Sequence, residues 1–251
     1  YTNKGEDHIS NVRRIVEQEQ IGGLILMQDD AAREITLVNE FQSKSKVPLM
    51  IGMDAEWGLF QRIAAAHKFP WAMTLGAIQD KNLITKMAAK IAEDSKRMGI
   101  NWDFAPVVDV NTNPDNPIIG NRSFGSEVQN VVNSALAYSN GLQDNRILAA
   151  IKHFPGHGDT STDSHFDLPV VAHNLDRLNA VELAPFKALM DKGIGGVMVA
   201  HLYVPALEKE NGIPASISKN IITGLLKEKF GYKGLIITDA LNMGAVAKRY
   251  K

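Results

Sequence analysis

Short apolar runs alternate with amphipathic segments along most of the chain. The apolar runs are brief, are often flanked by Gly or Pro, and rarely alternate with polar residues, which predicts strands buried on both faces. Six runs fit this description: residues 21–27, 47–53, 99–110, 147–153, 193–201 and 234–239. Between them, apolar residues recur at helical spacing from Ile9 to Val16, Ile35 to Phe41, Leu83 to Ile91, Leu183 to Met190 and Ile222 to Leu226. This order predicts an α/β fold with a parallel sheet and helical crossovers.

A parallel sheet of this kind is either doubly wound or closed into a barrel. No Gly-rich loop of the G-x-G-x-x-G type lies directly between a predicted strand and helix, which disfavours a dinucleotide-binding fold. A complete barrel has eight strands, whereas this chain has six, begins in a helical segment and stops within the helix that should follow the sixth strand. We therefore expect residues 1–251 to form a single, partial (β/α)8 TIM-type barrel domain that lacks its first and last strands.

Composition narrows the function classes. The 251 residues are 45% hydrophobic and 22% charged, as in soluble globular proteins with a large core. Twenty-seven basic against 28 acidic residues disfavour a nucleic-acid partner, and no apolar stretch reaches the roughly 18 residues of a membrane span. The absence of Cys excludes disulfides and cysteine-ligated metals. The compartment stays open: the cytoplasm, or the periplasm or cell surface if a signal sequence has been removed.

Ionisable residues stand where the apolar runs end. They are Asp54, Asp109, Lys152 with His153, His201 and Asp239. In a parallel barrel the carboxyl ends of the strands open on one face, where active sites of this fold are built. We therefore expect these far-apart segments to converge, and the longest predicted loops, 54–80, 110–127 and 154–179, to carry function.

The stretch "IKHFPGHGDTSTDSHFDLP" (151–169) crowds three histidines and three aspartates into one loop and admits three interpretations. One is a metal site, whose ligands would come from His153, His157, Asp159, Asp163 and His165. Pro155 argues against it, because it disfavours the helix that a His pair at i, i+4 needs. A second is a loop whose polar side chains bond its own backbone.

The third interpretation of this loop is proton transfer. Asp163 and His165 fall on the same side of an extended segment, so the carboxylate can orient the imidazole and favour its protonated form. A histidine placed in this way can donate a proton near neutral pH. Asp239, at the end of "GLIITD", supplies a carboxylate facing that acid across the barrel mouth, an arrangement that suits glycoside hydrolysis.

At these residues the chain resembles the bacterial β-N-acetylglucosaminidases of glycoside hydrolase family 3. "KHFPGHGDTSTDSH" is similar to their signature loop, and "ITDALNMGAV" to the segment that carries their nucleophile. Further similar segments are "DFAPVVDVNTNPDNPIIGNRSFG" (103–125) and "MDAEWGLFQR" (53–62). The resemblance covers nearly the whole chain in order, and the long histidine motif is its most specific part.

The resemblance implies a role for each matching residue. Asp239 matches the nucleophile that forms a covalent glycosyl-enzyme, and His165 the acid/base, with Asp163 as its partner. The residues that match binders of the terminal sugar's hydroxyls are Asp54, Arg62, Arg122, Lys152 and His153. The implied fold is the (β/α)8 barrel, often followed by further chain and sometimes a fused C-terminal domain. Neither a cofactor nor a metal is implied.

The implied activity is a retaining exo-β-N-acetylglucosaminidase that acts on peptidoglycan-type glycosides, with a small carbohydrate as its binding partner. The preference for the N-acetyl group comes from the resemblance alone. A β-glucosidase or β-xylosidase of the same family, a phosphorolytic variant and a non-catalytic sugar-binding module remain alternatives.

One motif departs from the family. Where relatives commonly have "DQEGG", this chain has Asp54-Ala55-Glu56-Trp57-Gly58. Trp57 either stacks on a sugar or packs in the core.

Overall fold

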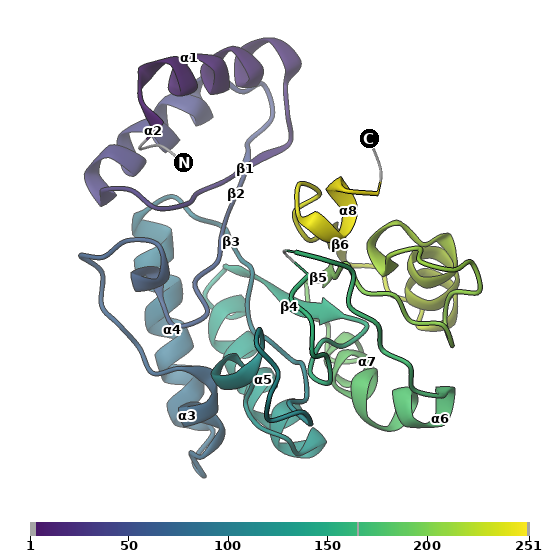
Figure 1. Cartoon of the computed structure of the whole chain (residues 1–251). Coiled ribbons are helices and arrows are strands. Elements are labelled where there is room, and N and C mark those ends of the chain that lie inside the picture. Colours follow the sequence, from purple (N-terminus) through teal and green to yellow (C-terminus); the bar gives the residue numbers. More distant parts are fainter. Residues whose placement is uncertain (1–3, 165, 250–251) are drawn as a thin grey trace.

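The computed structural model describes residues 4–164 and 166–249. In chain order the elements are α1 (Glu6–Arg14), the π-helical turn η2 (Ile15–Glu19), β1 (Gly23–Ile25), α2 (Ala31–Lys44), β2 (Met50–Met53), the 3-10 turn η3 (Leu59–Gln61), α3 (Ala72–Gly76), α4 (Asn82–Arg97), β3 (Trp102–Asp103), η4 (Gly120–Arg122), α5 (Val128–Gln143), β4 (Leu148–Phe154), α6 (Leu175–Arg177), η5 (Leu178–Glu182), α7 (Ala184–Met190), β5 (Gly196–Val199), η6 (Ala215–Ile217), η7 (Asn220–Lys229), β6 (Leu235–Thr238) and α8 (Gly244–Ala247). Figure 1 shows their arrangement.

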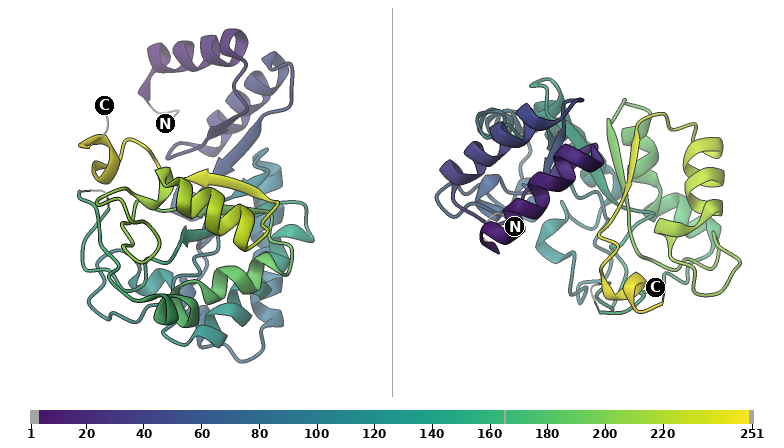
Figure 2. Two further views of the ribbon diagram at one scale, coloured as in Figure 1. Left: turned by 90° about the vertical axis from the view of Figure 1, so that its right-hand side faces the viewer. Right: turned by 90° about the horizontal axis from the view of Figure 1, so that it is seen from above.

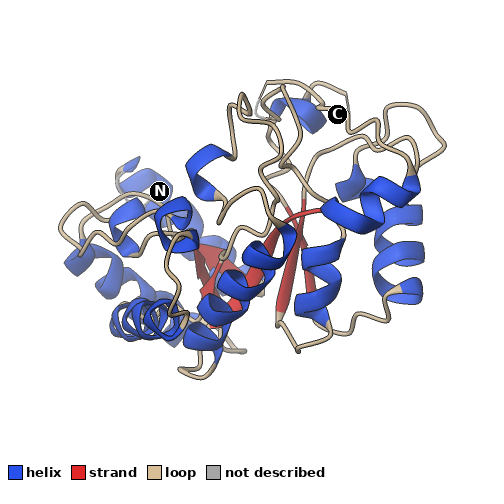
Figure 3. Ribbon diagram, turned by 90° about the horizontal axis from the view of Figure 1, so that it is seen from below, coloured by secondary structure: helices blue, strands red, loops and turns tan. Residues whose placement is uncertain are grey.

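The six strands form one parallel sheet in sequential order, β1 to β6. The sheet is curled into a half-barrel, with helices along its outer side (Figure 3). The N-terminal helices and the C-terminal part of the chain lie at its two ends (Figure 2). The predicted parallel α/β fold is confirmed in this form, which fits an incomplete TIM-type barrel, whereas a closed barrel of eight strands is not formed by the described residues.

Two apolar layers hold the sheet. The larger core lies between the strands and the outer helices, and it includes Ile51, Ile151 and Val197, none of which is exposed. The smaller cluster contains the buried side chains of Trp102, Phe104, Ala150 and Met198. Strand residues therefore contribute to both clusters, which is why the apolar runs in the sequence do not alternate with polar residues.

Two predicted segments differ from the structure. The run 99–110 forms a regular strand only over Trp102–Asp103, because Pro106 has no N–H to donate to the ladder. Beyond it, the segment still pairs irregularly with β4, where the Val108 N–H donates to the Lys152 carbonyl at 2.8 Å. Helix α5 was not among the predicted helices, because its Ala, Ser, Asn and Gly residues weaken the apolar pattern. Gly141 lets α5 approach α4 closely: a Cβ there would lie 2.4 Å from the Thr85 carbonyl oxygen.

The long loops also contain short helical turns. Helix α3 lies within 54–80 and packs against η4 and α5, and α6 lies within 154–179. No helix among the described residues is long and apolar enough to cross a bilayer.

Candidate active site

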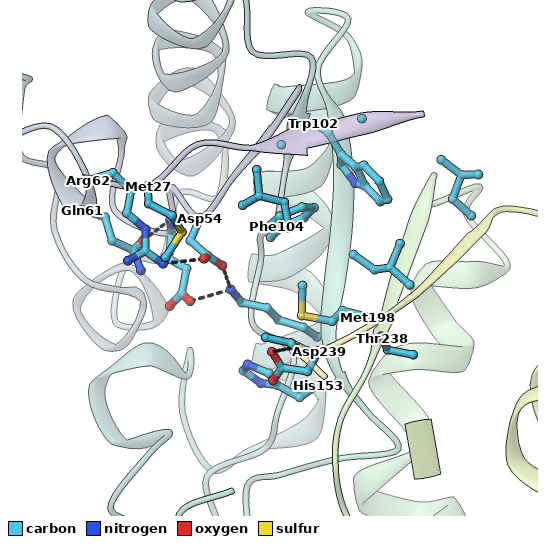
Figure 4. A pocket seen from close by; sticks show the side chains of 18 of the residues that line it. Met27, Asp54, Gln61, Arg62, Trp102, Phe104, His153, Met198, Thr238 and Asp239 are labelled. Atoms are coloured by element: carbon cyan, nitrogen blue, oxygen red, sulfur yellow. Dashed lines mark hydrogen bonds and ion pairs between the residues drawn. The ribbon is translucent and has the colours of Figure 1, made fainter. Parts of the chain in front are cut away.

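A cavity of about 670 Å³ opens where β2, β4 and β6 end. Its apolar floor comes largely from strand residues, including Met50, Trp102 and Met198, and from Phe104 just beyond β3. Its polar residues are Asp54, Glu56, Gln61, Arg62, Arg122, Lys152, His153, His157, Ser164, Thr238 and Asp239. Figure 4 shows Asp54 and Arg62 on one side of this cavity and Asp239 with Thr238 on another. Chain segments far apart in sequence therefore meet at one mouth, as a parallel barrel predicts.

Three cations and two carboxylates form a cluster on one wall. The Lys152 Nζ lies 2.8 Å from the Asp54 Oδ1 and 2.7 Å from the Glu56 Oε1. Arg122 donates two hydrogen bonds to the Glu56 carboxylate, from Nε at 2.9 Å and from Nη2 at 2.7 Å. Arg62 donates from Nη2 to the Asp54 Oδ2 at 2.5 Å. This forked, charge-assisted pairing fixes donors and acceptors before any ligand arrives.

Burial and neighbouring charge oppose each other in this cluster. Burial by itself would raise the pKa of Glu56, but the Arg122 and Lys152 charges outweigh it and hold that pKa far below its usual range. Burial likewise opposes ionisation of Asp54, and Lys152 with Arg62 lowers its pKa in spite of it. The pKa of Lys152 is raised, because Asp54 and Glu56 outweigh the burial that would lower it. Asp54, Glu56 and Lys152 are therefore charged near neutral pH.

A second set of buried groups lies behind this wall and holds His153 and His157 in place. The His153 Nδ1 lies 2.7 Å from the Asp109 Oδ2, and its Nε2 lies 3.2 Å from the Arg122 Nη2. Asp109 also accepts the His157 backbone N–H at 2.7 Å. Burial lowers the pKa of His157 to about 4, so the His157 ring is neutral at pH 7. Its Nδ1 lies 2.6 Å from the Thr160 Oγ1.

A contact between Asp159 and His173 holds the base of the histidine loop (151–169), and the loop also contacts the C-terminal helix α8. The Asp159 Oδ2 lies 2.5 Å from the His173 Nε2, across the loop. The Ala245 N–H of α8 donates to the Ser164 carbonyl at 3.2 Å, and the Lys248 Nζ donates to the Phe166 carbonyl at 2.7 Å. Asp163 lies within this held segment, whereas the predicted acid/base His165 lies outside the described residues.

Asp239 follows β6 directly and is half-buried at the cavity. Its N–H donates to the Val199 carbonyl at 2.9 Å, which extends the β5–β6 pairing by one residue, and its Oδ1 accepts the Ala240 N–H at 2.7 Å. These bonds fix the backbone that carries the carboxylate. His201 lies behind it, with Nε2 at 2.9 Å from the Ala240 carbonyl and Nδ1 at 2.6 Å from the Ser216 Oγ.

The predicted convergence is therefore partly right. Asp54, Lys152, His153 and Asp239 line one cavity with Arg62 and Arg122, whereas Asp109 and His201 lie behind it as supports. Sequence reasoning missed Glu56, the carboxylate that joins Lys152 to Arg122. Its position two residues after Asp54, on the same side of an extended segment, is the signal that could have found it.

Trp57, for which two environments were open, does not line this cavity. Its ring stacks on Trp71, with centroids 4.9 Å apart and planes 16° apart. Among the described residues, the histidine loop does not bring together the metal ligands considered from the sequence. His153 and His157 are held by Asp109 and Thr160, and Asp159 lies instead with His173 and Glu182.

Residues 6–251 match the family model described as the glycosyl hydrolase family 3 N-terminal domain. The chain belongs to glycosyl hydrolase family 3. Among curated relatives, Beta-hexosaminidase A of Pseudoalteromonas piscicida is 38% identical over 256 residues, covering 93% of this chain and 43% of that protein. The resemblance seen in the sequence, and with it the prediction of a glycoside hydrolase domain, is confirmed at the level of the family.

Solved structures share the fold. The β-N-acetylglucosaminidase from Paenibacillus sp. superposes with a TM-score of 0.93 at 38% identity, over 100% of this chain and 48% of that one. NagZ from Neisseria gonorrhoeae, solved with N-trifluoroacetyl-D-glucosamine, gives a TM-score of 0.85 at 30% identity, over 95% of this chain and 73% of that one. The chain thus spans less than half the length of the Pseudoalteromonas and Paenibacillus proteins.

Proposed function

We propose that this family 3 domain is the catalytic part of a retaining exo-β-N-acetylglucosaminidase that releases terminal N-acetylglucosamine from peptidoglycan-type glycosides. The observation that carries the proposal is the composition of one cavity. Fixed cations and carboxylates line one wall, and the half-buried carboxylate of Asp239 lines another. The first set suits the hydroxyls of a terminal sugar, and the second suits attack on its anomeric carbon.

In the first step, the Asp239 carboxylate attacks the anomeric carbon as the bond to the departing oxygen breaks. Protonated His165 gives its proton to that oxygen, and a covalent glycosyl-aspartate remains. In the second step, water attacks the same carbon, neutral His165 takes the proton of the water, and the bond to Asp239 breaks. Asp163 stabilises the imidazolium in the first step and orients the ring in both.

The hydroxyl-binding role falls to Asp54, Arg62, Arg122, Lys152 and His153. Because these side chains are already paired with one another, the sugar meets groups that need little reorganisation. Glu56 joins them as a positioning residue, since it holds Lys152 and Arg122 together.

The preference for an acetamido sugar is supported by relatives, because the Pseudoalteromonas and Paenibacillus proteins bear hexosaminidase and N-acetylglucosaminidase names. The domain is proposed to act on a small-molecule carbohydrate substrate. The prediction that further strands and a fused C-terminal domain belong to the parent protein stays a prediction, as does its compartment.

The test compares hydrolysis of aryl N-acetyl-β-glucosaminide and aryl β-glucoside by the full-length protein, with Asp239→Asn as the inactive control. Cleavage of the acetamido substrate alone, abolished in the control, is the expected result. Preferred cleavage of the glucoside would favour the β-glucosidase alternative, and sugar-1-phosphate formed on addition of phosphate would favour phosphorolysis. Binding of N-acetylglucosamine without any turnover would favour a sugar-binding module.

A further inference from the structure

A second cavity, of about 450 Å³, lies outside the catalytic cavity. It is formed by residues 68–71, by Met73 and Thr74 of α3, and by one residue of η4. Its side chains include Lys68, Phe69, Trp71, Thr74 and Asn121. Trp71 stands out among them, because 38% of this large apolar residue is exposed.

The indole of Trp71 is held in place from behind. Trp57 stacks on it with centroids 4.9 Å apart and planes 16° apart. Phe69 packs against Gly58 so closely that a Cβ at Gly58 would lie 2.6 Å from its ring, and the φ of 84° at Gly58 also favours glycine. The aromatic surface at the cavity is therefore formed before a ligand binds, which lowers the entropy lost on binding.

Residues adjacent in sequence line or support the two cavities. Glu56 lines the catalytic cavity, and the next residue, Trp57, supports Trp71 in the second. Arg122 lines the catalytic cavity, whereas its neighbour in η4, Asn121, lines the second. Two hydrogen bonds between Arg122 and Glu56 join the two segments that carry these residues.

The lining matches one class of ligand. A pyranose ring presents an apolar C–H face that can stack on an indole, and hydroxyl and amide groups around its edge. Thr74 and Asn121 can bond such groups as donors or acceptors, and the Lys68 ammonium can donate to them. The residues that line this cavity include no carboxylate, so a neutral sugar or one with an acidic substituent meets no repulsion.

We propose that this cavity is an accessory binding site for a chain of β-linked N-acetylglucosamine units. This inference rests on the proposed function for the class of its ligand. The site holds an extended saccharide beside the catalytic cavity through Trp71, and it plays no part in the chemical step. A short aryl glycoside, which occupies only the catalytic cavity, does not use it.

The experiment measures, for the full-length protein, the KM for an aryl N-acetyl-β-glucosaminide and for the β-1,4-linked N-acetylglucosamine pentasaccharide. Trp71→Ala should raise the KM for the pentasaccharide roughly three- to tenfold, the range expected for one aromatic contact, and leave the aryl substrate unchanged. Trp71→Phe, which keeps an aromatic ring, should raise the KM for the pentasaccharide much less. Leu83→Ala is the matched control, because Leu83 is another exposed apolar residue, 51% exposed, and lies on α4 outside the cavity.

An equal rise in KM for both substrates would overturn the proposal, because Trp71 would then support the fold or the catalytic cavity. An unchanged KM for the pentasaccharide would overturn it as well. Calorimetric binding of the pentasaccharide to Asp239→Asn, with and without Trp71→Ala, separates this inference from the proposed function. Weaker binding only in the double variant supports the accessory site even if the wild type cleaves neither substrate.

Discussion

Asp103 provides a test of how burial sets the charge of a carboxyl group in this fold. It is the last residue of β3 and is fully buried. Its Oδ1 accepts the Ala55 N–H at 3.0 Å, while its Oδ2 has no hydrogen-bond partner among the described residues. Burial raises the pKa of Asp103 from its ordinary 3.8 to about 7, against the opposing effects of the Ala55 hydrogen bond and the Lys152 charge.

The sign of the resulting pH dependence follows from proton binding. Because the folded pKa exceeds the unfolded one, the folded state binds more protons between these values, and stability falls as pH rises. The contribution is fully present below about pH 4 and lost by about pH 7. A shift of this size corresponds to about 4 kcal/mol in all, of which about 3 kcal/mol falls between pH 5 and pH 8.

Asp103→Asn removes the titration while keeping an acceptor for the Ala55 N–H. We expect the wild type to lose about 3 kcal/mol more of its unfolding free energy than the variant between pH 5 and pH 8. Guanidinium denaturation followed by tryptophan fluorescence measures this difference. Asp115→Asn, at an exposed loop position, is the control. Parallel pH profiles for wild type and Asp103→Asn would refute the reasoning.

Three other substitutions test the cavity wall and the histidine loop. Lys152→Met leaves Asp54 and Glu56 without their shared ammonium and should cost about 3–5 kcal/mol of unfolding free energy in denaturant titrations; a loss below about 1 kcal/mol would contradict the ion-pair cluster. Arg122→Ala should weaken inhibition by N-acetylglucosamine about tenfold or more, and an unchanged inhibition constant would remove Arg122 from the sugar site. Asp163→Ala should slow turnover of an alkyl glycoside by about a hundredfold and that of an activated aryl glycoside much less, because only the poor leaving group needs the proton; equal slowing would argue against the Asp163–His165 pair.

The strands were predictable because their residues supply both apolar clusters of the half-barrel, which leaves a run of apolar residues as a clear signal. The meeting of Asp54, Lys152 and Asp239 followed from parallel topology alone, since the carboxyl ends of the strands share one edge. Helix α5 escaped prediction because its contact with α4 depends on small residues such as Gly141, which carry little hydrophobic signal.

The rest of the site depends on contacts between distant segments, and these leave little local trace. Glu56 owes its role to Arg122, 66 residues away, and to Lys152. Asp109 and His201 also follow strands, as the cavity residues do. However, Asp109 is bonded to His153 and His201 to the Ala240 carbonyl, so both lie behind the cavity. A strand-end position therefore predicts nearness to the cavity, whereas the direction of each side chain is set by its partners.

The central claim, that Asp239 is the nucleophile of a retaining N-acetylglucosaminidase, is tested most directly by trapping the covalent intermediate. The full-length protein would be incubated with a 5-fluoro N-acetyl-β-glucosaminyl fluoride, digested, and examined by mass spectrometry. The account predicts one added fluorosugar on the peptide that contains Asp239, and none in the Asp239→Asn variant. A label on a different carboxylate, or turnover of the aryl substrate that Asp239→Asn leaves unaffected, would contradict it.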